Sequence, residues 1–275
     1  MDRKQFIEEL SSDFVADKIY EIWPELDYNF SRKVSSTSEV IKERFERGEL
    51  DAPALLVAGE QTAGRGRKNR SWFSPPAGGM YISFLLSPAV PSNRITLYTV
   101  VSGLAVQKCL ENFSYPVRLR WPNDIYLDGR KVAGILSEYI NLPERQERVS
   151  AGIGINVCVD NFPKELEGKA TSLHKYDCKI PSASALLFSL IEEMGAYNQR
   201  LKDGCGDQLL EYWKDRLDII DSKVKINSGR KCRRGTVRDI TSRGELVVEM
   251  EDELRKVRAG DVKREYCRRR ERKDA

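Results

Sequence analysis

The chain has 275 residues, of which 40% are hydrophobic and 32% are charged. A chain of this length and apolar content can bury a substantial core, which predicts a globular protein with one large domain and one small one. Its 46 Lys and Arg residues against 42 Asp and Glu residues leave a net charge of +4, too small to indicate a nucleic-acid-binding protein. The locally basic end of the chain, residues 268–275, is expected to be a solvated tail.

The sequence offers no sign of export or of a metal centre. Its first residues are charged where a signal peptide needs an apolar segment, and no apolar run reaches the roughly 18 residues of a membrane helix. We therefore expect a cytoplasmic protein without membrane association. The six cysteines form no Cys-x-x-Cys pair, and the single histidine, His174, is expected to be structural, so no metal site is predicted.

The first elements read as a helix, a strand and a second helix. Hydrophobic residues at helical spacing predict one amphipathic helix over residues 3–22, too short a segment for a three-helix DNA-binding domain. A strand is expected over residues 28–34. Ser36 and Glu39 then have the spacing of a capping box, and Gly48 is a plausible end for that helix. The serines of this segment either cap the helix or bind a polar ligand group, and both interpretations stay open.

A cationic loop follows the continuous apolar run Ala54–Ala58, which predicts a buried strand. The loop reads Gly64-Arg65-Gly66-Arg67-Lys68-Asn69-Arg70-Ser71-Trp72-Phe73. Glycine lets the backbone approach a ligand, and the planar fork of arginine suits carboxylates and phosphates. The loop is therefore expected to hold anions, with a solvated basic loop or a non-specific nucleic-acid patch as the open alternatives.

The middle of the chain predicts a hairpin. After a strand over residues 80–86, a helix over 94–113 and a strand over 117–121, Asp128-Gly129 marks a tight turn between antiparallel strands at 125–127 and 131–137. Strict alternation along the second strand places Lys131 on the same face as Ala133 and Ile135. A lysine there needs an anionic partner if that face is buried.

Glycines also interrupt the apolar strand predicted over residues 151–157. Gly152 and Gly154 weaken a strand unless a ligand or a neighbouring strand comes close, and the sequence does not choose between these two. Two helices, 182–201 and 208–217, are expected to follow. Beyond Ser222, short alternating runs predict a small antiparallel barrel of about 50 residues.

Four of these motifs, in this order, resemble those of the biotin protein ligases. They are Gly64-Arg65-Gly66-Arg67 with Trp72-Phe73-Ser74-Pro75, then Trp121-Pro122-Asn123-Asp124, Lys131-Val132-Ala133-Gly134-Ile135-Leu136, and Gly152-Ile153-Gly154-Ile155-Asn156. The resemblance implies an α+β fold in which helices flank a mixed, largely antiparallel sheet, the class II synthetase-like catalytic domain, followed by a small C-terminal β-barrel. It suggests four segments: a helical extension (1–27), the catalytic domain (28–218), the barrel (219–267) and the basic tail (268–275).

The resemblance also implies an activity. Biotin and ATP, with Mg²⁺, would give biotinyl-5′-adenylate, and a lysine of a biotin carboxyl carrier protein or carboxylase biotin domain would then take the biotinyl group. No specific DNA binding is expected, because the DNA-binding domain of the repressor-type members is not seen. Pairing of two chains through an exposed strand edge is left open.

The roles of individual residues follow from the resemblance, position by position. It implies that the catalytic residues are Arg65, Arg67 and Lys131. It implies that biotin meets Ser36, Thr37, Ser38, Gln61, Arg65, Gly66, Arg67, Lys131, Gly134, Gly152 and Gly154. It implies that ATP meets Arg65, Arg67, Trp72, Asn123, Asp124, Lys131 and Asn156. The chain departs from the family at Ser35 and Ser38, where Asp and Asn are common, and at Asn69, where Gly is frequent, so contacts at these positions are in doubt.

Two other functions are compatible with parts of the sequence. A lipoate or octanoate ligase or transferase shares the fold, but those proteins carry an Arg-Arg-x-Gly-Gly-Gly run followed by a histidine, and His174 has no such setting. A nucleic-acid-binding module could use the basic loop and tail. A salt titration with single and double strands separates that function from catalysis.

Overall fold

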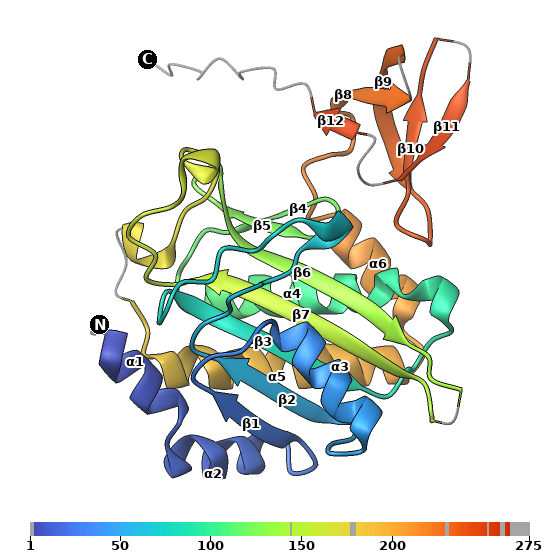
Figure 1. The fold of residues 1–275 in the computed structure, drawn as a ribbon. Coiled ribbons are helices and arrows are strands. Elements are labelled where there is room, and N and C mark those ends of the chain that lie inside the picture. Colours follow the sequence, from blue (N-terminus) through green and yellow to red (C-terminus); the bar gives the residue numbers. More distant parts are fainter. Residues whose placement is uncertain are drawn as a thin grey trace. The chain divides into compact units, whose positions relative to one another are not determined.

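The computed structural model describes residues 3–143, 145–176, 180–228, 231–251, 253–258 and 262–264. The chain divides into two compact units, Met1–Arg216 and Leu217–Ala275, and each is described by itself (Figure 1). The expected basic tail, 268–275, and the last three residues of the expected barrel lie outside the described residues. No helix within the described part of the chain has the length and apolar character needed to span a membrane.

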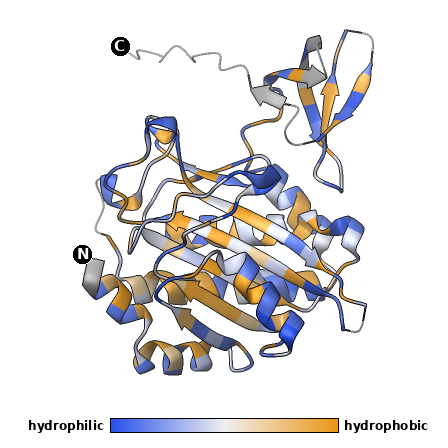
Figure 2. Cartoon of the chain, viewed as in Figure 1, coloured by the Kyte–Doolittle hydropathy of each residue, from blue (hydrophilic) through white to orange (hydrophobic). Residues whose placement is uncertain are grey.

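The first unit is built on a seven-stranded sheet with the order β1-β2-β3-β7-β6-β5-β4. Its strands are β1 (Asp27–Ser31), β2 (Ala54–Ala58), β3 (Gly79–Leu86), β4 (Arg118–Arg120), β5 (Asp124–Leu127), β6 (Arg130–Ile140) and β7 (Arg148–Asn156). The β1–β2 pair is parallel and the remaining pairs are antiparallel, so the predicted mixed sheet is confirmed. Every residue of β2 and β3 is buried, and Figure 2 shows β2 as a hydrophobic segment.

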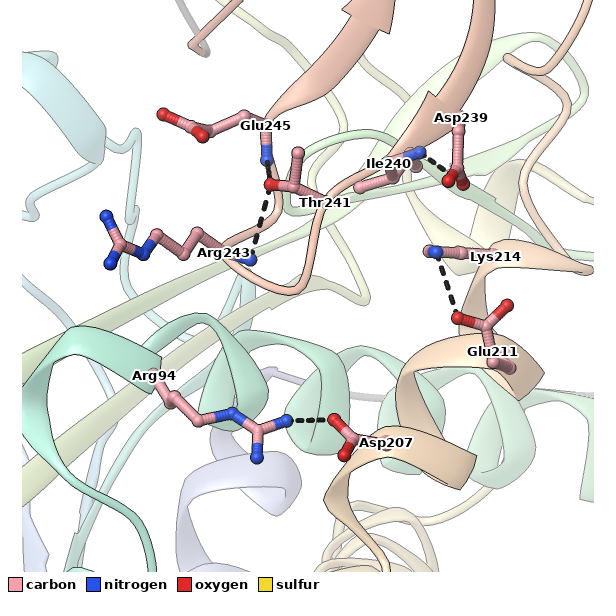
Figure 3. A network of polar contacts seen from close by, with 9 residues as sticks. All are labelled: Arg94, Asp207, Glu211, Lys214, Asp239, Ile240, Thr241, Arg243 and Glu245. Carbon is pink, nitrogen blue, oxygen red and sulfur yellow. Dashed lines mark hydrogen bonds and ion pairs between the residues drawn. The ribbon is translucent and has the colours of Figure 1, made fainter. Parts of the chain in front are cut away.

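Helices cover both faces of this sheet (Figure 1). They are α3 (Thr37–Arg47), α4 (Thr96–Asn112), α5 (Ala183–Lys202) and α6 (Gly206–Lys214). Helix α4 packs against α5, α6 and β6 on one face, and α3 packs against β2, β3 and β7 on the other. An ion pair between Arg94 and Asp207 attaches the start of α6 to the segment before α4 (Figure 3).

The N-terminal segment differs from its prediction. Residues 3–22 form two helices, α1 (Arg3–Leu10) and α2 (Asp13–Ile22), instead of one. The break occurs because Ser12 adopts an extended backbone and its hydroxyl accepts a hydrogen bond from the amide of Val15, which starts a new helix. Both helices pack against α5. The expected strand at 28–34 is also shorter, because β1 ends at Ser31.

The second unit contains a five-stranded antiparallel sheet with the order β11-β10-β9-β8-β12. The strands are β8 (Lys223–Ser228), β9 (Lys231–Ile240), β10 (Leu246–Glu249), β11 (Leu254–Val257) and β12 (Val262–Arg264). The predicted small antiparallel domain is confirmed, but within the described residues its sheet does not close into a barrel. The two edge strands, of four and three residues, pair only with β10 and β8, and no ladder joins them to each other.

Residues 241–245 form the turn between β9 and β10. The hydroxyl of Thr241 accepts hydrogen bonds from the amides of Arg243 and Glu245, at 3.3 and 3.2 Å (Figure 3). Gly244 takes a positive φ of 76°, a backbone conformation that glycine adopts without strain. This turn lets β9 and β10 pair as neighbours, with a bulge between Val247 and Val248.

Candidate active site

Polar side chains gather around the first turn of α3 and form what we call the polar floor. It consists of Ser36, Thr37 and Ser38 at the start of α3, Gln61 after β2, and Ser83 in β3. The amide and the hydroxyl of Thr37 donate hydrogen bonds to the side-chain carbonyl of Gln61, at 2.8 and 3.2 Å. Ser83, in β3, donates to the Thr37 hydroxyl at 2.9 Å and lies 3.3 Å from the Ser38 hydroxyl. The four hydroxyl residues are almost fully buried. Thr37, Ser38, Gln61 and Ser83 therefore form a connected polar network.

Ser36 begins α3 as expected, but its side chain does not cap the helix. It is the N-cap residue of α3, but its side chain makes no capping hydrogen bond, so the predicted capping box with Glu39 is wrong. Its hydroxyl is buried, with 1% of the residue exposed, and has no hydrogen-bond partner among the described residues. A buried hydroxyl without a partner costs about 1–3 kcal/mol. A polar ligand group that reached Ser36 would recover that free energy.

The cationic loop forms a small hairpin beside the floor. Arg65 and Ser71 are bridged as antiparallel partners, and the amide of Gly66 donates to the carbonyl of Arg70 at 2.7 Å. Lys68 and Asn69 form its tip with positive φ angles of 58° and 57°. Asparagine tolerates this left-handed conformation better than most residues. Asn69 can therefore stand where relatives of the predicted family often carry glycine, with the turn preserved.

The two glycines of the loop differ in what requires them. A Cβ on Gly64 would lie 2.5 Å from the carbonyl oxygen of Trp72 and 2.7 Å from the hydroxyl of Ser74, so no side chain fits there. A Cβ on Gly66 would come no closer than 3.4 Å, to the Arg70 carbonyl, and the φ of Gly66 is an ordinary −126°. The protein alone therefore requires glycine at position 64, whereas position 66 has room for a side chain.

Trp72 lies against the glycines of two neighbouring strands. Gly134 of β6 and Gly154 of β7 are register partners. A Cβ on Gly154 would lie 2.5 Å from the indole nitrogen of Trp72, and one on Gly134 would lie 3.0 Å from its ring. The indole N–H is buried without a hydrogen-bond acceptor among the described residues. A Cβ on Gly152 would meet the Ser38 hydroxyl at 2.7 Å, so the third glycine faces the polar floor.

Lys131 reaches this site through an irregularity in its strand. Ile125 pairs with Ala133 but Tyr126 pairs with Lys131, which makes Val132 an extra residue in β6. The predicted shared face with Ala133 and Ile135 is therefore wrong. The Lys131 nitrogen lies 3.1 Å from the position of a Cβ on Gly134 and 5.1 Å from the centre of the Trp72 ring. The expected anionic partner is present, because the Lys131 nitrogen forms an ion pair with an Asp124 carboxylate oxygen at 2.6 Å.

The two loop arginines have different surroundings. Arg65 forms ion pairs with Glu39 and Glu138, at 3.1 and 3.3 Å. The side chain of Arg67 makes no hydrogen bond or ion pair with any residue in the described part of the chain. Burial lowers the pKa of its guanidinium, and the nearby Asp124 carboxylate opposes that shift. Arg67 is thus a partly buried cation that forms no ion pair with the described residues, and it lies near the Asp124 carboxylate that pairs with Lys131.

The two predicted asparagines serve the scaffold in this structure. The side-chain amide of Asn123 donates to the Ile135 carbonyl at 2.6 Å and helps to close the β5–β6 hairpin. Asn156, at the end of β7, donates to the Thr171 carbonyl at 3.0 Å and is buried. Both therefore hold neighbouring backbone segments in place. Their contacts with a nucleotide stay a prediction.

Sequence reasoning missed some residues that organise the site. Ser83 connects the floor, and a signal existed, because it is a polar residue inside an otherwise apolar strand. Ser74 accepts a hydrogen bond from the Gln61 amide at 2.8 Å and donates one to the Trp72 carbonyl at 3.1 Å, which joins the floor to the loop. Glu39 and Glu138 lie far apart in the sequence, so their shared partner could not be read from it.

The lone histidine contacts the segment that follows β7. The His174 ring contacts the Val157 carbonyl and the Asp160 carboxylate, at 3.3 and 3.2 Å. Its partners are local, as expected of a structural residue. Within the ranges described above, no group of three or more His, Cys, Asp or Glu side chains is arranged to hold a metal ion.

Comparisons with known proteins agree with this geometry. Residues 30–156 match the model of the biotin/lipoate A/B protein ligase family, and residues 219–263 match that of the biotin protein ligase C terminal domain. The bifunctional ligase/repressor BirA of Bacillus spizizenii is 31% identical over 235 residues, which cover 83% of this chain and 71% of that protein. The chain belongs to the biotin protein ligase family.

Other members of the family extend the similarity. The biotin–[acetyl-CoA-carboxylase] ligase of Mycobacterium tuberculosis is 28% identical over 246 residues, covering 87% of this chain and 89% of that one. A solved biotin protein ligase from Aquifex aeolicus, in complex with biotin and ATP, superposes with a TM-score of 0.73 at 28% identity, covering 87% of this chain and 98% of the other. The resemblance seen in the motifs is therefore confirmed for the catalytic and C-terminal regions.

Proposed function

We propose that this chain activates biotin with ATP and attaches it to a lysine of a biotin carboxyl carrier protein. In the first step a carboxylate oxygen of biotin attacks the α-phosphorus of ATP, and the bond to pyrophosphate breaks. In the second step the lysine amine attacks the acyl carbon, the bond to AMP breaks, and the amine loses its proton. The proposal is supported by relatives that are named as biotin ligases and by a similar structure that binds biotin and ATP.

The observation that carries the proposal is the pair of cations beside an uncharged, hydroxyl-lined floor. Bringing a carboxylate to about 4 Å from a phosphate costs about 4 kcal/mol at an effective dielectric constant of 20, so nearby positive charge is required. Among the described residues, Arg67 makes no ion pair, and Lys131 forms one with Asp124. In this proposal both cations stabilise the charge on the α-phosphate during transfer, and no covalent enzyme intermediate is needed.

The polar floor would hold the neutral end of biotin. Its ureido ring has hydrogen-bond donors and a carbonyl acceptor but no charge, so the hydroxyls of Ser36, Thr37 and Ser38 suit it, with Gln61 beside them. Gly134, Gly152 and Gly154 form a wall without side chains, which lets Trp72 and the Ser38 hydroxyl lie close to the sheet. Direct contact of biotin with these glycines stays a prediction. Gly66 would come near the biotin carboxylate by its backbone, since nothing in the protein itself requires glycine there.

The nucleotide would lie at the other end of the same site. Trp72 offers a flat ring for the adenine, and Asn123, Asp124 and Asn156 border this side. Mg²⁺ would enter with ATP, held by phosphate oxygens and water. The assignment of Arg65 as a third clamp on the charged groups remains a prediction, because its guanidinium is already paired with two carboxylates. A cytoplasmic location and pairing of two chains also remain predictions.

The proposal is tested by incubating the protein with ATP, Mg²⁺ and an acceptor domain, and measuring the intact mass of that domain. A biotin domain supplied with biotin should gain one biotinyl group. A lipoyl domain supplied with lipoate is the matched control and should stay unmodified. Modification of the lipoyl domain alone would assign the chain to the lipoate branch of the fold. Unchanged masses in both arms would contradict the proposal.

A further inference from the structure

Arg65 joins three segments of the catalytic unit. Its guanidinium contacts Glu39 in the first turn of α3 and Glu138 in β6, at 3.1 and 3.3 Å. Its backbone is bridged to Ser71 on the other arm of the cationic loop. Holding Arg65 therefore holds both arms of the loop beside the polar floor. We call the Arg65–Glu39–Glu138 contact the strap.

The charge of the strap argues against a direct role for Arg65 in binding substrate. One guanidinium beside two carboxylates carries a net charge of −1, which repels a triphosphate or a carboxylate. Arg67, two residues later, makes no ion pair with any described residue. The loop thus contains one cation neutralised by the protein and one available to an anion.

We propose that Glu39 and Glu138 are positioning residues, which act through Arg65 to hold the cationic loop against the polar floor before substrates bind. Arg65 is then part of the strap, and Arg67 is the loop cation that meets the substrate. This inference rests on the proposed function for its effect on catalysis, but not for its effect on the loop. Ion pairs between partly exposed groups are weak, so the strap restrains the loop and still lets substrates enter.

The test removes the negative charge of the strap and keeps its volume. In Glu39→Gln/Glu138→Gln, trypsin should cut the ligand-free protein after the exposed residues Lys68 and Arg70 about tenfold faster than in the wild type. The KM for ATP should rise by a similar factor while kcat stays within about twofold, because only the ordering of the loop is lost. Arg65→Ala should raise the rate of tryptic cleavage to the same extent, and adding it to the double variant should raise that rate no further.

The chain offers a matched control on the same helix. Arg47 also lies between two glutamates, Glu43 and Glu49, at 3.9 and 3.8 Å. Glu43→Gln/Glu49→Gln removes the same charges at the far end of α3. It should leave both the tryptic cleavage and the KM for ATP unchanged. A rise in either would mean that loss of surface charge, and not loss of the strap, produces the effect.

A charge exchange separates the strap from a substrate contact. Arg65→Glu should free the loop, and Arg65→Glu/Glu138→Arg should restore its resistance to trypsin, since the ion pair is remade in reverse. Melting curves of every variant check that the fold is intact. The single variants Glu39→Gln and Glu138→Gln, expected to show intermediate cleavage, replace any double variant that unfolds.

Two results have opposite meanings. If Glu39→Gln/Glu138→Gln behaves as the wild type in both measurements while Arg65→Ala loses kcat, the inference is overturned and Arg65 is itself a catalytic residue. If the cleavage changes as expected but neither the wild type nor any variant activates biotin, the strap is supported and the proposed function fails. The tryptic measurement needs no substrate, so the two failures cannot be confused.

Discussion

Replacing Lys131 by methionine tests the proposed chemistry at a single charge. The substitution keeps an unbranched side chain beside Trp72 and removes the cation that lies 2.6 Å from Asp124. If that cation stabilises the α-phosphate as charge moves, its loss costs about 3–4 kcal/mol in the transition state. This corresponds to a rate about 10²–10³-fold lower, as for other preorganised charge-stabilising groups.

The effect on folding should be much smaller. The side chains of Lys131 and Asp124 are 28% and 23% exposed, so solvent screens the pair and its loss should cost about 1 kcal/mol or less. The melting temperature should fall by no more than about 2–4 °C. A large loss of rate with a small loss of stability is the signature of a catalytic role.

The assay is the biotin-dependent release of pyrophosphate in a single turnover, measured without acceptor protein. Lys214→Met is the control, because Lys214 also pairs with a carboxylate, that of Glu211, at 2.9 Å, but lies on α6 (Figure 3). It should release pyrophosphate at the wild-type rate. The reasoning is refuted if Lys131→Met reacts within about tenfold of the wild type while its melting curve is unchanged.

Three further predictions concern the loop glycines, Trp72 and the Asp51–Arg148 ion pair. Gly64→Ala should expose the ligand-free loop to trypsin because its Cβ would collide with the Trp72 carbonyl, whereas Gly66→Ala should keep the wild-type digestion pattern and raise only the KM for biotin. Trp72→Phe keeps an aromatic ring on the glycine wall, so its KM for ATP should change less than that of Trp72→Ala when both are measured by initial rates. The hydrogen bonds from Arg148 lower the pKa of Asp51 in the folded protein below its unfolded-state value, near 3.8. The ion pair therefore contributes its full stabilisation above about pH 3.8, and this stabilisation is lost as the pH falls through the lower folded-state pKa. Urea unfolding should therefore show Asp51→Asn less stable than the wild type at neutral pH, with the difference vanishing in strong acid; a constant difference would contradict this.

Much of the fold could be predicted because local patterns determine it. The run Ala54–Ala58 forms a buried strand as expected, and Gly48 ends α3 with a φ of 75°. The hairpin also forms at Asp128 and Gly129, both of which have the positive φ that its turn requires. In each case neighbouring residues carry the whole signal. The resemblance likewise assigned the loop, the lysine and the glycines to one ligand site, and that assignment stays a prediction.

The parts that could not be predicted depend on contacts between distant residues. The bulge at Val132, which turns Lys131 toward the glycine wall, comes from how β5 and β6 pair and not from the sequence of β6. Arg65 finds its partners on α3 and β6, 26 and 73 positions away. The expected capping box failed for a related reason, because Glu39 pairs with Arg65 instead of returning to the start of its own helix.

The central claim is that this protein activates biotin with ATP. The exchange of labelled pyrophosphate into ATP measures that step directly. With biotin and Mg²⁺ present, the wild-type protein should catalyse the exchange, and Arg67→Ala and Lys131→Met should each lower its rate by at least about a hundredfold. Exchange that does not depend on biotin, or wild-type exchange in both variants, would contradict the account.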